Sequence, residues 1–555
     1  MRLTRAVKTV PAVAALTAGL LLAIAVPTFA VEDVPADETP TEATPAEKAA
    51  AAPPARAGEP TFTIKKFIIE GTTLFPLAVL EQRLKEFTGR KKTAADVEGA
   101  REALERFFHD RGYPTVLVNI PEQKVESRVI RLEVIENRIG NLTITGNRWF
   151  STEKIRRDLP SLAPGEVLYL PRVQEEVGRI NRHPDFKAIP DMQPGKTAES
   201  VDFTLKVEDK LPLHGSLELN NRSNHDTTAL RLNAALRYDN LWQREHSISA
   251  QYQFSPQNPS EVEIASGSYT LPSPWEFNDK LVVYGVWSNT KTAYGAGFSN
   301  LGKGMIIGSR AIFPLPAAGE YGHTAVLGFD YKEFEETVGL AGSEPVKTPV
   351  SYLPFSVSYS GFLRDASGVT QINAGAVVAF RGAVTDSSKF MDKRYKARGN
   401  YVVATAGVER TQQLPIGFSL TAKVDGQLSD QPLISNEQYI AGGIDTVRGY
   451  KESEASGDNA AHGLFELAGP DLLKSVGKER FSLTPYLFYD AAALWTREPL
   501  AGQQSVVDLQ GTGLGVRGLL FRDVDYQVDL AFALRDTTRI AAGDASCHFK
   551  VRYQF

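Results

Sequence analysis

Apolar and polar residues alternate with a period of two from Leu213 to the last residue, Phe555. Successive side chains of a β-strand point to opposite faces of its sheet, so this alternation predicts strands with one apolar and one polar face. The first three runs read LHGSLELN, LRLNAALRY and SISAQYQF, and short connections separate them. We therefore expect residues 211–555 to form an all-β domain without a helical segment.

A soluble β-sandwich and a membrane barrel both show such alternation, with the apolar face turned inward in the first and outward in the second. The polar faces here carry ionisable residues such as Arg231, Arg237 and Asp529, which suits a water-filled lumen. Beyond the first thirty residues no apolar run reaches the ~18 residues of a transmembrane helix, so a membrane-spanning form must be a closed barrel. At roughly 10 residues per strand and a similar length per connection, about 16 antiparallel strands fit.

The final run, CHFKVRYQF, alternates strictly and ends on the aromatic Phe555. A buried strand of a soluble protein can end in the same way. In a barrel this strand would close the sheet, and we expect Phe555 to act as a C-terminal assembly signal.

The N-terminal region carries the features of a secreted protein. Residues 1–30 combine a basic start, an apolar run and the small-residue site TFA, which is typical of a signal peptide, and the run is short for a membrane anchor. Residues 31–60 are rich in Pro, Ala, Glu and Thr and predict a flexible linker.

An internal repeat occupies residues 61–210. A shift of 75 positions superimposes hydrophobic residues and glycines without gaps. The matched pairs are Phe67 with Leu142, Ile69 with Ile144, Gly71 with Gly146, Phe75 with Phe150, Leu80 with Ile155 and Leu84 with Leu159. Each copy reads as strand, two helices and two strands, so we expect two small α+β domains at 61–137 and 138–210.

One stretch of the barrel region cannot be a strand. NEQYIAGGIDTVRGYKESEASGDNA, residues 436–460, opens with the doublet Gly442 and Gly443, which permits backbone angles that a strand does not use. The motif Val447, Arg448, Gly449 and Tyr450 follows. We expect this loop to fold back into the barrel and to meet the strand-like run FYDAA at 488–492.

Composition and motifs argue against an enzyme. The formal net charge of -5 disfavours nucleic acid as a partner, and the lone Cys547 excludes an intrachain disulfide. HExxH, GxSxG and GxxxxGK[ST] are absent, and GLGVRG at 513–518 lacks the strand-to-helix context of a phosphate loop. We expect no catalytic residue, no cofactor and no metal site, and we expect His462 to be a solvated loop residue.

With these features in place, residues 61–555 resemble the outer-membrane transporters of two-partner secretion, the TpsB or ShlB/FhaC/HecB type, within the superfamily that joins POTRA domains to a β-barrel. GGIDTVRGY at 442–450 resembles the VRGY motif of their sixth extracellular loop, and SGD at 456–458 the "GD" downstream of it. MQPGKTAESVDFTLKV at 192–207 is similar to the end of the second POTRA domain. FYDAA is similar to the FxDxG strand motif, with Ala492 in place of the family's glycine.

The resemblance implies a function as well as a fold. It implies a 16-stranded barrel in the bacterial outer membrane, with periplasmic POTRA domains that receive an unfolded exoprotein and pass it through the pore without ATP. Activation of a secreted haemolysin or adhesin belongs to the same expectation. The implied partners are this exoprotein client, outer-membrane lipid and the barrel assembly machinery, with no nucleic acid.

The resemblance also assigns roles to the loop. Asp490 is implied as the partner of Arg448, with Phe488 beside it on the same strand. A charge inside a barrel is costly unless it is paired or hydrated. We expect the pair to lie in a wet lumen and to contribute a few kcal/mol at most, which would bias the loop between two positions without locking it.

Two other functions remain open from the sequence. A relative that inserts or assembles outer-membrane proteins shares the superfamily, although such proteins usually carry more POTRA copies. A passive porin or receptor with periplasmic adaptor domains is the second alternative. A gene for a large β-helical exoprotein next to this one would favour secretion.

Overall fold

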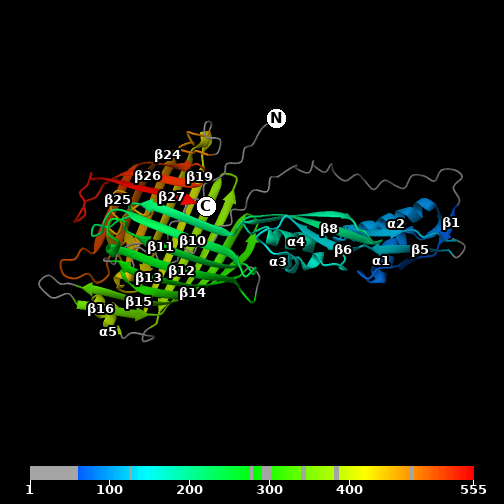
Figure 1. Cartoon of the computed structure of the whole chain (residues 1–555), viewed down its shortest axis with the longest axis horizontal. Coiled ribbons are helices and arrows are strands. Elements are labelled where there is room, and N and C mark those ends of the chain that lie inside the picture. The colour runs from blue at the N-terminus through cyan, green and yellow to red at the C-terminus, as the bar shows by residue number, and fades with distance from the viewer. Residues whose placement is uncertain are drawn as a thin grey trace. The chain divides into compact units, whose positions relative to one another are not determined.

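The computed structural model describes residues 61–124, 128–275, 279–290, 302–338, 346–380, 387–474 and 480–555 (Figure 1). The signal peptide and the linker expected at 1–30 and 31–60 lie outside these ranges. The chain divides into two compact units, which meet in the sequence between Pro212 and Leu213. Among the described helices, none combines the length and the apolar composition needed to cross a membrane.

The first repeat folds into a three-stranded sheet covered by two helices. In its sheet, β2 and β5 are parallel and β4 is antiparallel to β5, while β1 and β3 form a separate two-stranded sheet. Apolar residues of both helices, such as Leu80, Leu84 and Leu104, pack in one core with those of the sheet. The elements are β1 (Phe62–Ile64), β2 (Lys66–Glu70), α1 (Leu77–Leu84), β3 (Gly89–Lys92), α2 (Ala94–His109), β4 (Val116–Asn119) and β5 (Val129–Glu136).

The second repeat has the same topology. Here β6 and β8 are parallel and β7 is antiparallel to β8, and a separate core lies between this sheet and its helices. The elements are β6 (Arg138–Thr145), α3 (Thr152–Asp158), α4 (Leu170–Ile180), β7 (Phe186–Pro194) and β8 (Ser200–Asp209). The predicted order of strand, two helices and two strands is confirmed in both copies.

Each repeat contains the same turn after its first strand. Gly71 and Gly146 have φ of 85° and 88°, and a Cβ on either would lie 2.3 Å from the carbonyl oxygen of Val134 or Val207. Only glycine fits such a turn, because an added side chain would meet both an unfavourable backbone angle and a neighbouring strand. The matched glycines therefore report a structural duplication and not a chance alignment.

A carboxylate at the end of each last strand holds the segment after this turn. Glu136 accepts hydrogen bonds from the backbone N–H groups of Thr73 and Leu74 at 2.6 and 3.1 Å. Asp209 accepts them in the second copy from the N–H groups of Trp149 and Phe150, at 2.6 and 2.9 Å. Both copies thus tie the first helix to the last strand by the same device.

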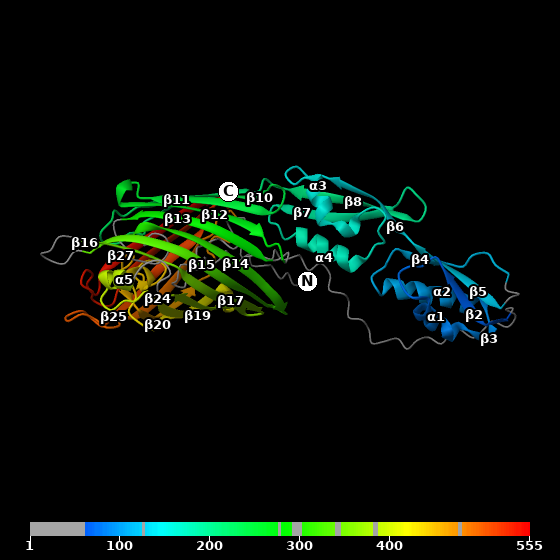
Figure 2. The same ribbon diagram turned by 90° about the horizontal axis from the view of Figure 1, so that it is seen from below.

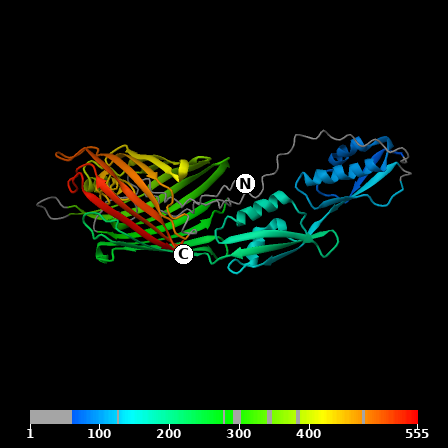
Figure 3. The same cartoon turned by 90° about the horizontal axis from the view of Figure 1, so that it is seen from above.

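The second unit is a closed antiparallel barrel. Its strands pair in chain order, and the last one, β27, returns to the first, β9; Figure 3 shows the red last strand beside the green first ones. The strands are β9 (Leu213–Asn220), β10 (Arg231–Leu241), β11 (His246–Phe254), β12 (Val262–Pro272), β13 (Lys280–Thr290), β14 (Lys303–Ala318), β15 (Tyr321–Val338), β16 (Val346–Tyr352), β17 (Pro354–Asp365), β18 (Gly368–Ala379), β19 (Tyr401–Gln413), β20 (Ser419–Ser429), β23 (Asn459–Ala468), β24 (Thr484–Trp495), β25 (Val506–Leu520), β26 (Val524–Ala533) and β27 (Ala545–Gln554).

Two of these labels describe one strand. β16 and β17 both pair with β15, and their pairings Lys332 with Tyr352 and Phe329 with Phe355 continue in one register across Leu353. Counted as one, they give a barrel of 16 strands. The prediction of α+β POTRA repeats followed by a barrel of about 16 antiparallel strands is confirmed.

The barrel region also contains a helix, so the expectation of no helical segment is wrong there. α5 (Ser387–Lys393) lies in the connection between β18 and β19. Phe390 of this helix is buried, and its ring meets that of Tyr352 edge-on at 5.5 Å. The helix is only two turns long, and one buried apolar residue among its described side chains leaves too weak a periodic pattern to be recognised beside the strands.

We predict that Phe555 is needed to close the barrel. Its backbone N–H and C=O each form a 3.0 Å hydrogen bond with Gly215 of the first strand, and a Cβ on Gly215 would lie 2.2 Å from the Phe555 ring. Deletion of Phe555 should lower the amount of folded, heat-modifiable barrel in the membrane fraction and raise degradation. Phe555→Tyr, which keeps the backbone and the ring, is the control, and wild-type amounts after the deletion would contradict the closing role.

We also predict an acid-sensitive step in the first repeat. Burial raises the pKa of the Glu136 carboxyl, but hydrogen bonds from Thr73, Thr72 and Leu74 more than offset it, so the pKa lies below its ordinary value. A carboxyl whose pKa is lowered by folding stabilises the folded state at pH values above its unfolded-state pKa. This stability is lost as the pH falls through the folded-state pKa. In thermal unfolding of residues 61–210 between pH 7 and 3, Glu136→Gln should reduce the acid dependence. Thr73→Val should reduce the acid dependence in part. If the unfolding temperature falls with pH equally in the wild type and both variants, Glu136 is not the source of the acid dependence.

Candidate functional site

The residues expected to fold back into the barrel belong to the connection between β20 and β23, residues 430–458, which we call the lumen loop. Two short strands within it, β21 (Tyr439–Ala441) and β22 (Ala455–Gly457), pair into a hairpin. Gly442 and Gly443 follow β21 with φ of 109° and 100°. A Cβ on Gly442 would lie 2.5 Å from the carbonyl oxygen of Lys451, so the chain can turn there only because this residue has no side chain.

Arg448 lies inside the barrel against Asp490. Its Nε and Nη2 donate to Oδ2 and Oδ1 of Asp490 at 2.7 and 2.8 Å, and its backbone N–H donates to Oδ2 at 3.1 Å. Asp490 belongs to β24, whose alternate residues are buried, and so faces the interior. Charged, bidentate contacts of this kind are stronger and more directional than neutral hydrogen bonds.

Two further carboxylates surround the same guanidinium. Nη1 of Arg448 donates to Oε2 of Glu466 at 3.2 Å and lies 3.8 Å from Oδ1 of Asp529. The guanidinium carbon also lies 3.4 Å from the centre of the Phe488 ring, at cation–π distance. Three strands on one side of the barrel, β23, β24 and β26, therefore contribute an acid or a ring to hold one residue of the loop.

This cluster is enclosed by protein. Arg448 is 2% exposed and Asp490 0%, so the expectation that the pair lies in a wet part of the lumen is wrong. The reason is that the lumen loop fills the space around its own arginine. Removing one partner from a buried ion pair costs about 3–5 kcal/mol, because it leaves an unpaired charge away from water. A substitution that removes either partner therefore strongly disfavours the docked position of the loop.

Strand β25 makes room for the loop. A Cβ on Gly511 would lie 1.8 Å from the carbonyl oxygen of Arg448, and one on Gly513 would lie 2.7 Å from the Phe488 ring. The segment GLGVRG, which matches a phosphate-loop pattern in sequence, is part of this strand. Its inward glycines serve close packing around the arginine, which gives the motif a structural reason.

The residues on either side of Arg448 are also buried. The Tyr450 hydroxyl oxygen lies 3.0 and 2.8 Å from the carbonyl oxygens of Gln510 and Arg535, between which its single proton is shared. Val447 packs in the same cluster as Tyr450 and Ala492. A methyl group is thus accommodated at Ala492, where the family motif has glycine.

His462 is not a solvated loop residue, so that expectation is wrong. It lies on β23, is 2% exposed, and its Nδ1 is 2.8 Å from Oδ1 of Asp425 while its Nε2 is 3.0 Å from the carbonyl oxygen of Thr446. The histidine thus connects the wall strand β20 to the lumen loop two residues before Arg448. Its position within an alternating run was the available signal, and the nearby glycine-rich loop obscured it.

Asp458 is a second attachment point at the end of the loop. Its carboxylate accepts from both terminal nitrogens of Arg394 at 2.7 Å and from the backbone N–H groups of Leu433 and Arg497 at 2.8 and 2.7 Å. It joins the start of the lumen loop to the connections before β19 and after β24. The SGD motif pointed to Asp458, but nothing in the sequence pointed to Arg394.

Further ion pairs attach the loop to the rest of the wall. Glu437 pairs with Lys332 of β15 at 2.6 Å. In the connection after β9, Arg222 pairs with Asp445 and Glu452 of the loop. Nearby, Nε2 of His225 lies at hydrogen-bond distance, 2.6 Å, from Oε2 of Glu454. The lumen loop is therefore held on several sides at once.

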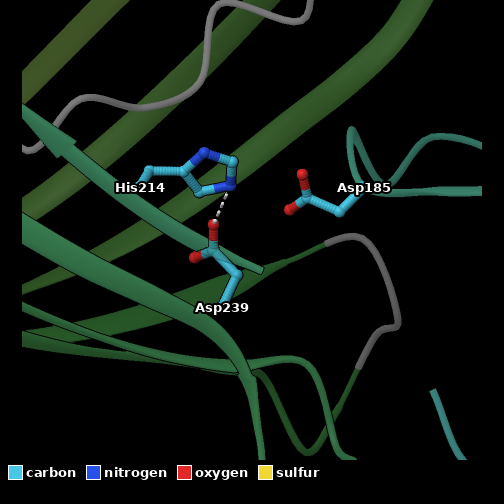
Figure 4. A group of neighbouring side chains, drawn as sticks. All are labelled: Asp185, His214 and Asp239. Carbon is cyan, nitrogen blue, oxygen red and sulfur yellow. Dashed lines mark ion pairs between the residues drawn. The ribbon is translucent and has the colours of Figure 1, made fainter. Parts of the chain in front are cut away.

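His214 and Asp239 form a separate pair on the adjacent strands β9 and β10 (Figure 4). Nε2 and Oδ2 are 3.7 Å apart. Asp185, the third side chain drawn, belongs to the other compact unit. Within the barrel unit the pair offers two ligand atoms, fewer than the three or four of a zinc site, so it makes no metal site by itself.

The residues of this site hold a loop in place and are not arranged for a chemical reaction. Its residues are an arginine, acids, aromatic rings and glycines that hold a loop in place, and among the described residues of this cluster none is arranged as a nucleophile with a base. A loop held by several ion pairs can be displaced only if all of them open. This arrangement suits a gate in a transport protein.

Comparison with known proteins identifies both parts of the chain. The family described as "POTRA domain, ShlB-type" matches residues 62–137, and the family described as "Haemolysin secretion/activation protein ShlB/FhaC/HecB" matches residues 320–518. The chain is 23% identical to the outer membrane transporter CdiB of Dickeya dadantii over 428 residues, 74% of this chain and 72% of that protein. It is 18% identical to the heme/hemopexin transporter protein HuxB of Haemophilus influenzae over 382 residues, 68% of this chain and 66% of that one.

Solved structures share the fold. CdiB from Escherichia coli superimposes with a TM-score of 0.59 at 18% identity, covering 91% of this chain and 93% of that one. BamA from Haemophilus ducreyi lacking POTRA domains 1–3 superimposes with a TM-score of 0.55 at 14% identity, covering 89% and 100%. Together the family matches and these relatives support a two-partner secretion transporter of the TpsB, or ShlB/FhaC/HecB, type within the POTRA-plus-barrel superfamily. The chain is thus a transporter and not an enzyme, with its barrel in the outer membrane and its POTRA domains in the periplasm.

Proposed function

We propose that this transporter binds an unfolded exoprotein with its POTRA domains and exports it through the barrel without ATP. The observation that carries this proposal is the buried lock of Arg448 against Asp490, which holds the loop inside the barrel. The ShlB-type family matches and the two POTRA repeats argue against a passive porin. A protein-conducting channel needs such a gate, because its pore must be closed between clients.

The POTRA domains offer surfaces that suit an extended client. β4 and β7 are edge strands of their sheets and expose the apolar side chains of Leu117, Ile189 and Met192. An unfolded segment can add to such an edge by backbone hydrogen bonds, while exposed apolar residues bind alternate side chains. We propose domain boundaries of 61–137 and 138–210 for the two copies and 211–555 for the barrel.

The energy for export comes, in this proposal, from the client itself. The periplasm holds no ATP, so folding of the client outside the cell must make export irreversible. The matched family includes haemolysin secretion and activation proteins, and we extend this to a client that is a secreted haemolysin or adhesin. The barrel assembly machinery and outer-membrane lipid complete the proposed set of partners, with Phe555 as the assembly signal.

An outer-membrane assembly factor is the second candidate, because the barrel and POTRA fold also superimpose on BamA. At 14% identity this likeness is one of fold alone. Both family matches are of the ShlB type, and they favour secretion over assembly.

We predict that residues 61–210 alone bind the unfolded N-terminal part of the exoprotein encoded next to this chain. Leu117→Gln and Ile189→Gln should each weaken binding by about tenfold, because each exposed apolar side chain contributes about 1.4 kcal/mol or more when it is buried. Binding should change little with salt, since the contact is apolar. Isothermal titration calorimetry or fluorescence anisotropy would measure both effects.

Leu77→Gln is the matched control for these variants. Leu77 is an exposed leucine on α1 and not on an edge strand, so its replacement should leave client binding unchanged. Absence of binding by the wild-type fragment at about 100 μM, roughly −5.5 kcal/mol, would show that the POTRA domains have another role.

We predict that Arg448→Ala leaves the protein abundant in the membrane but secretes poorly, with altered channel conductance. The substitution leaves three buried carboxylates, those of Asp490, Glu466 and Asp529, without their shared cation, at a cost of about 3–5 kcal/mol to the docked loop. Asp490→Asn should be milder, because Arg448 keeps two acids. The double variant should secrete no worse than Arg448→Ala, since both changes act on one cluster.

Arg410→Ala provides the control for the loss of an arginine. Arg410 of β19 pairs with Asp365 of β17 at 2.6 Å, and neither residue of this pair belongs to the lumen loop. Its removal should leave secretion of the client at the wild-type level. Normal secretion by Arg448→Ala, measured against membrane abundance, would show that the docked loop is not a gate.

A further inference from the structure

One end of the first POTRA domain carries a cluster of exposed cations. The cluster, which we call the basic end, comprises Lys65, Lys66, Arg90, Lys91 and Arg128. Within the part of the chain that the structure describes, no ion pair involves any of the five. By contrast, Lys92, the next residue along β3, is paired with Asp96 at 3.1 Å.

Strand pairing brings these cations together. The backbone N–H of Lys65 donates to the carbonyl oxygen of Arg128 at 2.8 Å, and Lys66 pairs with Val129 at the start of the parallel strands. Arg90 and Lys91 lie on β3, which pairs with β1 immediately before Lys65. Figure 1 labels β1 near β5, and Figure 2 labels β2 and β3 beside β5, at this end of the domain.

The second repeat shows that the fold does not need these charges. It builds the same pairing at the same place, with a bridge from Arg138 to Val167 and a 2.9 Å hydrogen bond from the Ile139 N–H to the carbonyl oxygen of Glu166. The positions that correspond to the five cations are Gly140, Asn141, Gly165, Glu166 and Val201. None is a cation and one is an acid, although the sheet and its helices are the same.

Five clustered like charges repel one another and are unfavourable for the free domain. Since the duplicated domain folds without them, their presence indicates an anionic partner. The chain itself contains such a partner close by in sequence. Residues 32–47 hold six acids, Glu32, Asp33, Asp37, Glu38, Glu42 and Glu47, and no Lys, Arg or His.

The length of the connection allows this segment to reach the basic end. Thirteen residues, 48–60, separate it from the first residue of the domain, and an extended chain of that length spans up to about 45 Å. A connection of this length keeps a segment at an effective concentration on the order of millimolar. Even weak ionic attraction is then sufficient for occupancy.

We propose that the acidic segment at residues 32–47 binds the basic end of the first POTRA domain within the same chain. The acidic segment covers a surface that would otherwise attract other anionic molecules. An anionic partner of the basic end must therefore displace the acidic segment. This inference is separate from the export function proposed above and does not depend on it. The segment acts through charge and needs no defined secondary structure.

The test uses the mature chain, residues 31–555, in detergent, beside the same chain without residues 32–47. The probe is a fluorescent peptide with the sequence of residues 31–48. We expect the shortened chain to bind the peptide at low salt and the complete mature chain to bind it at least about tenfold more weakly, because its own segment competes. Raising the salt to 300 mM should remove binding, since exposed charges are screened beyond about 6 Å at that concentration.

Two matched sets of variants in the shortened chain locate the site. Lys66→Gln, Arg90→Gln and Lys91→Gln together should abolish peptide binding. The control set replaces three exposed lysines of the second repeat, Lys187, Lys196 and Lys210, by glutamine and should bind like the parent. A peptide with all six acids changed to amides should not bind.

Three results would overturn the proposal. Equal peptide affinity for the complete and shortened chains would show that the segment does not occupy the site. Equal losses in the two variant sets would show that attraction is not localised to the basic end. Binding of phosphatidylglycerol vesicles by the basic end of both chains, without peptide binding, would assign the surface to a lipid and not to this segment.

Discussion

A single buried guanidinium sets the structure of the barrel interior. Arg448 lies among Asp490, Glu466 and Asp529, which come from strands β24, β23 and β26 on one side of the barrel, and the cation and its acids have little contact with water. Separating such charges without water to replace the contact is costly, so the loop that carries the arginine stays docked. The glycines of β25 leave room for the Arg448 backbone and the Phe488 ring, this ring lies against the guanidinium, and the Tyr450 hydroxyl holds the loop two residues further on.

The other attachments of the lumen loop make its docking cooperative. His462, Asp458, Lys332 and Arg222 each hold a different part of the loop from a different part of the barrel. When several contacts share one rigid loop, none of them opens alone without straining the rest. The gate that we propose for this loop would have two discrete states, docked and released, which suits a transporter whose pore must be closed until a client arrives.

The POTRA repeats show which features belong to a fold and which belong to a function. Both copies keep the left-handed glycine, Gly71 or Gly146, and both keep an acid at the end of the last strand to hold the following segment. The copies differ in surface charge, because surface residues contribute little to the packed core. Comparison of the two copies within one chain therefore separates structural residues from residues retained for a partner.

Sequence alone determined the periodic features of this protein. Alternation fixed the strands and their inward faces, the repeat fixed two domains, and the interruption at 436–460 identified the loop, because each of these is a local pattern along the chain. Arg448 and Asp490 were paired only through the family resemblance. Tertiary structure decided the rest: Glu466 and Asp529 join the arginine, Arg394 meets Asp458, and His462 is buried. These contacts form between strands that are distant in sequence and that meet only when the barrel closes. Whether a charge is buried depends on what fills the space around it. A local sequence pattern contains neither kind of information.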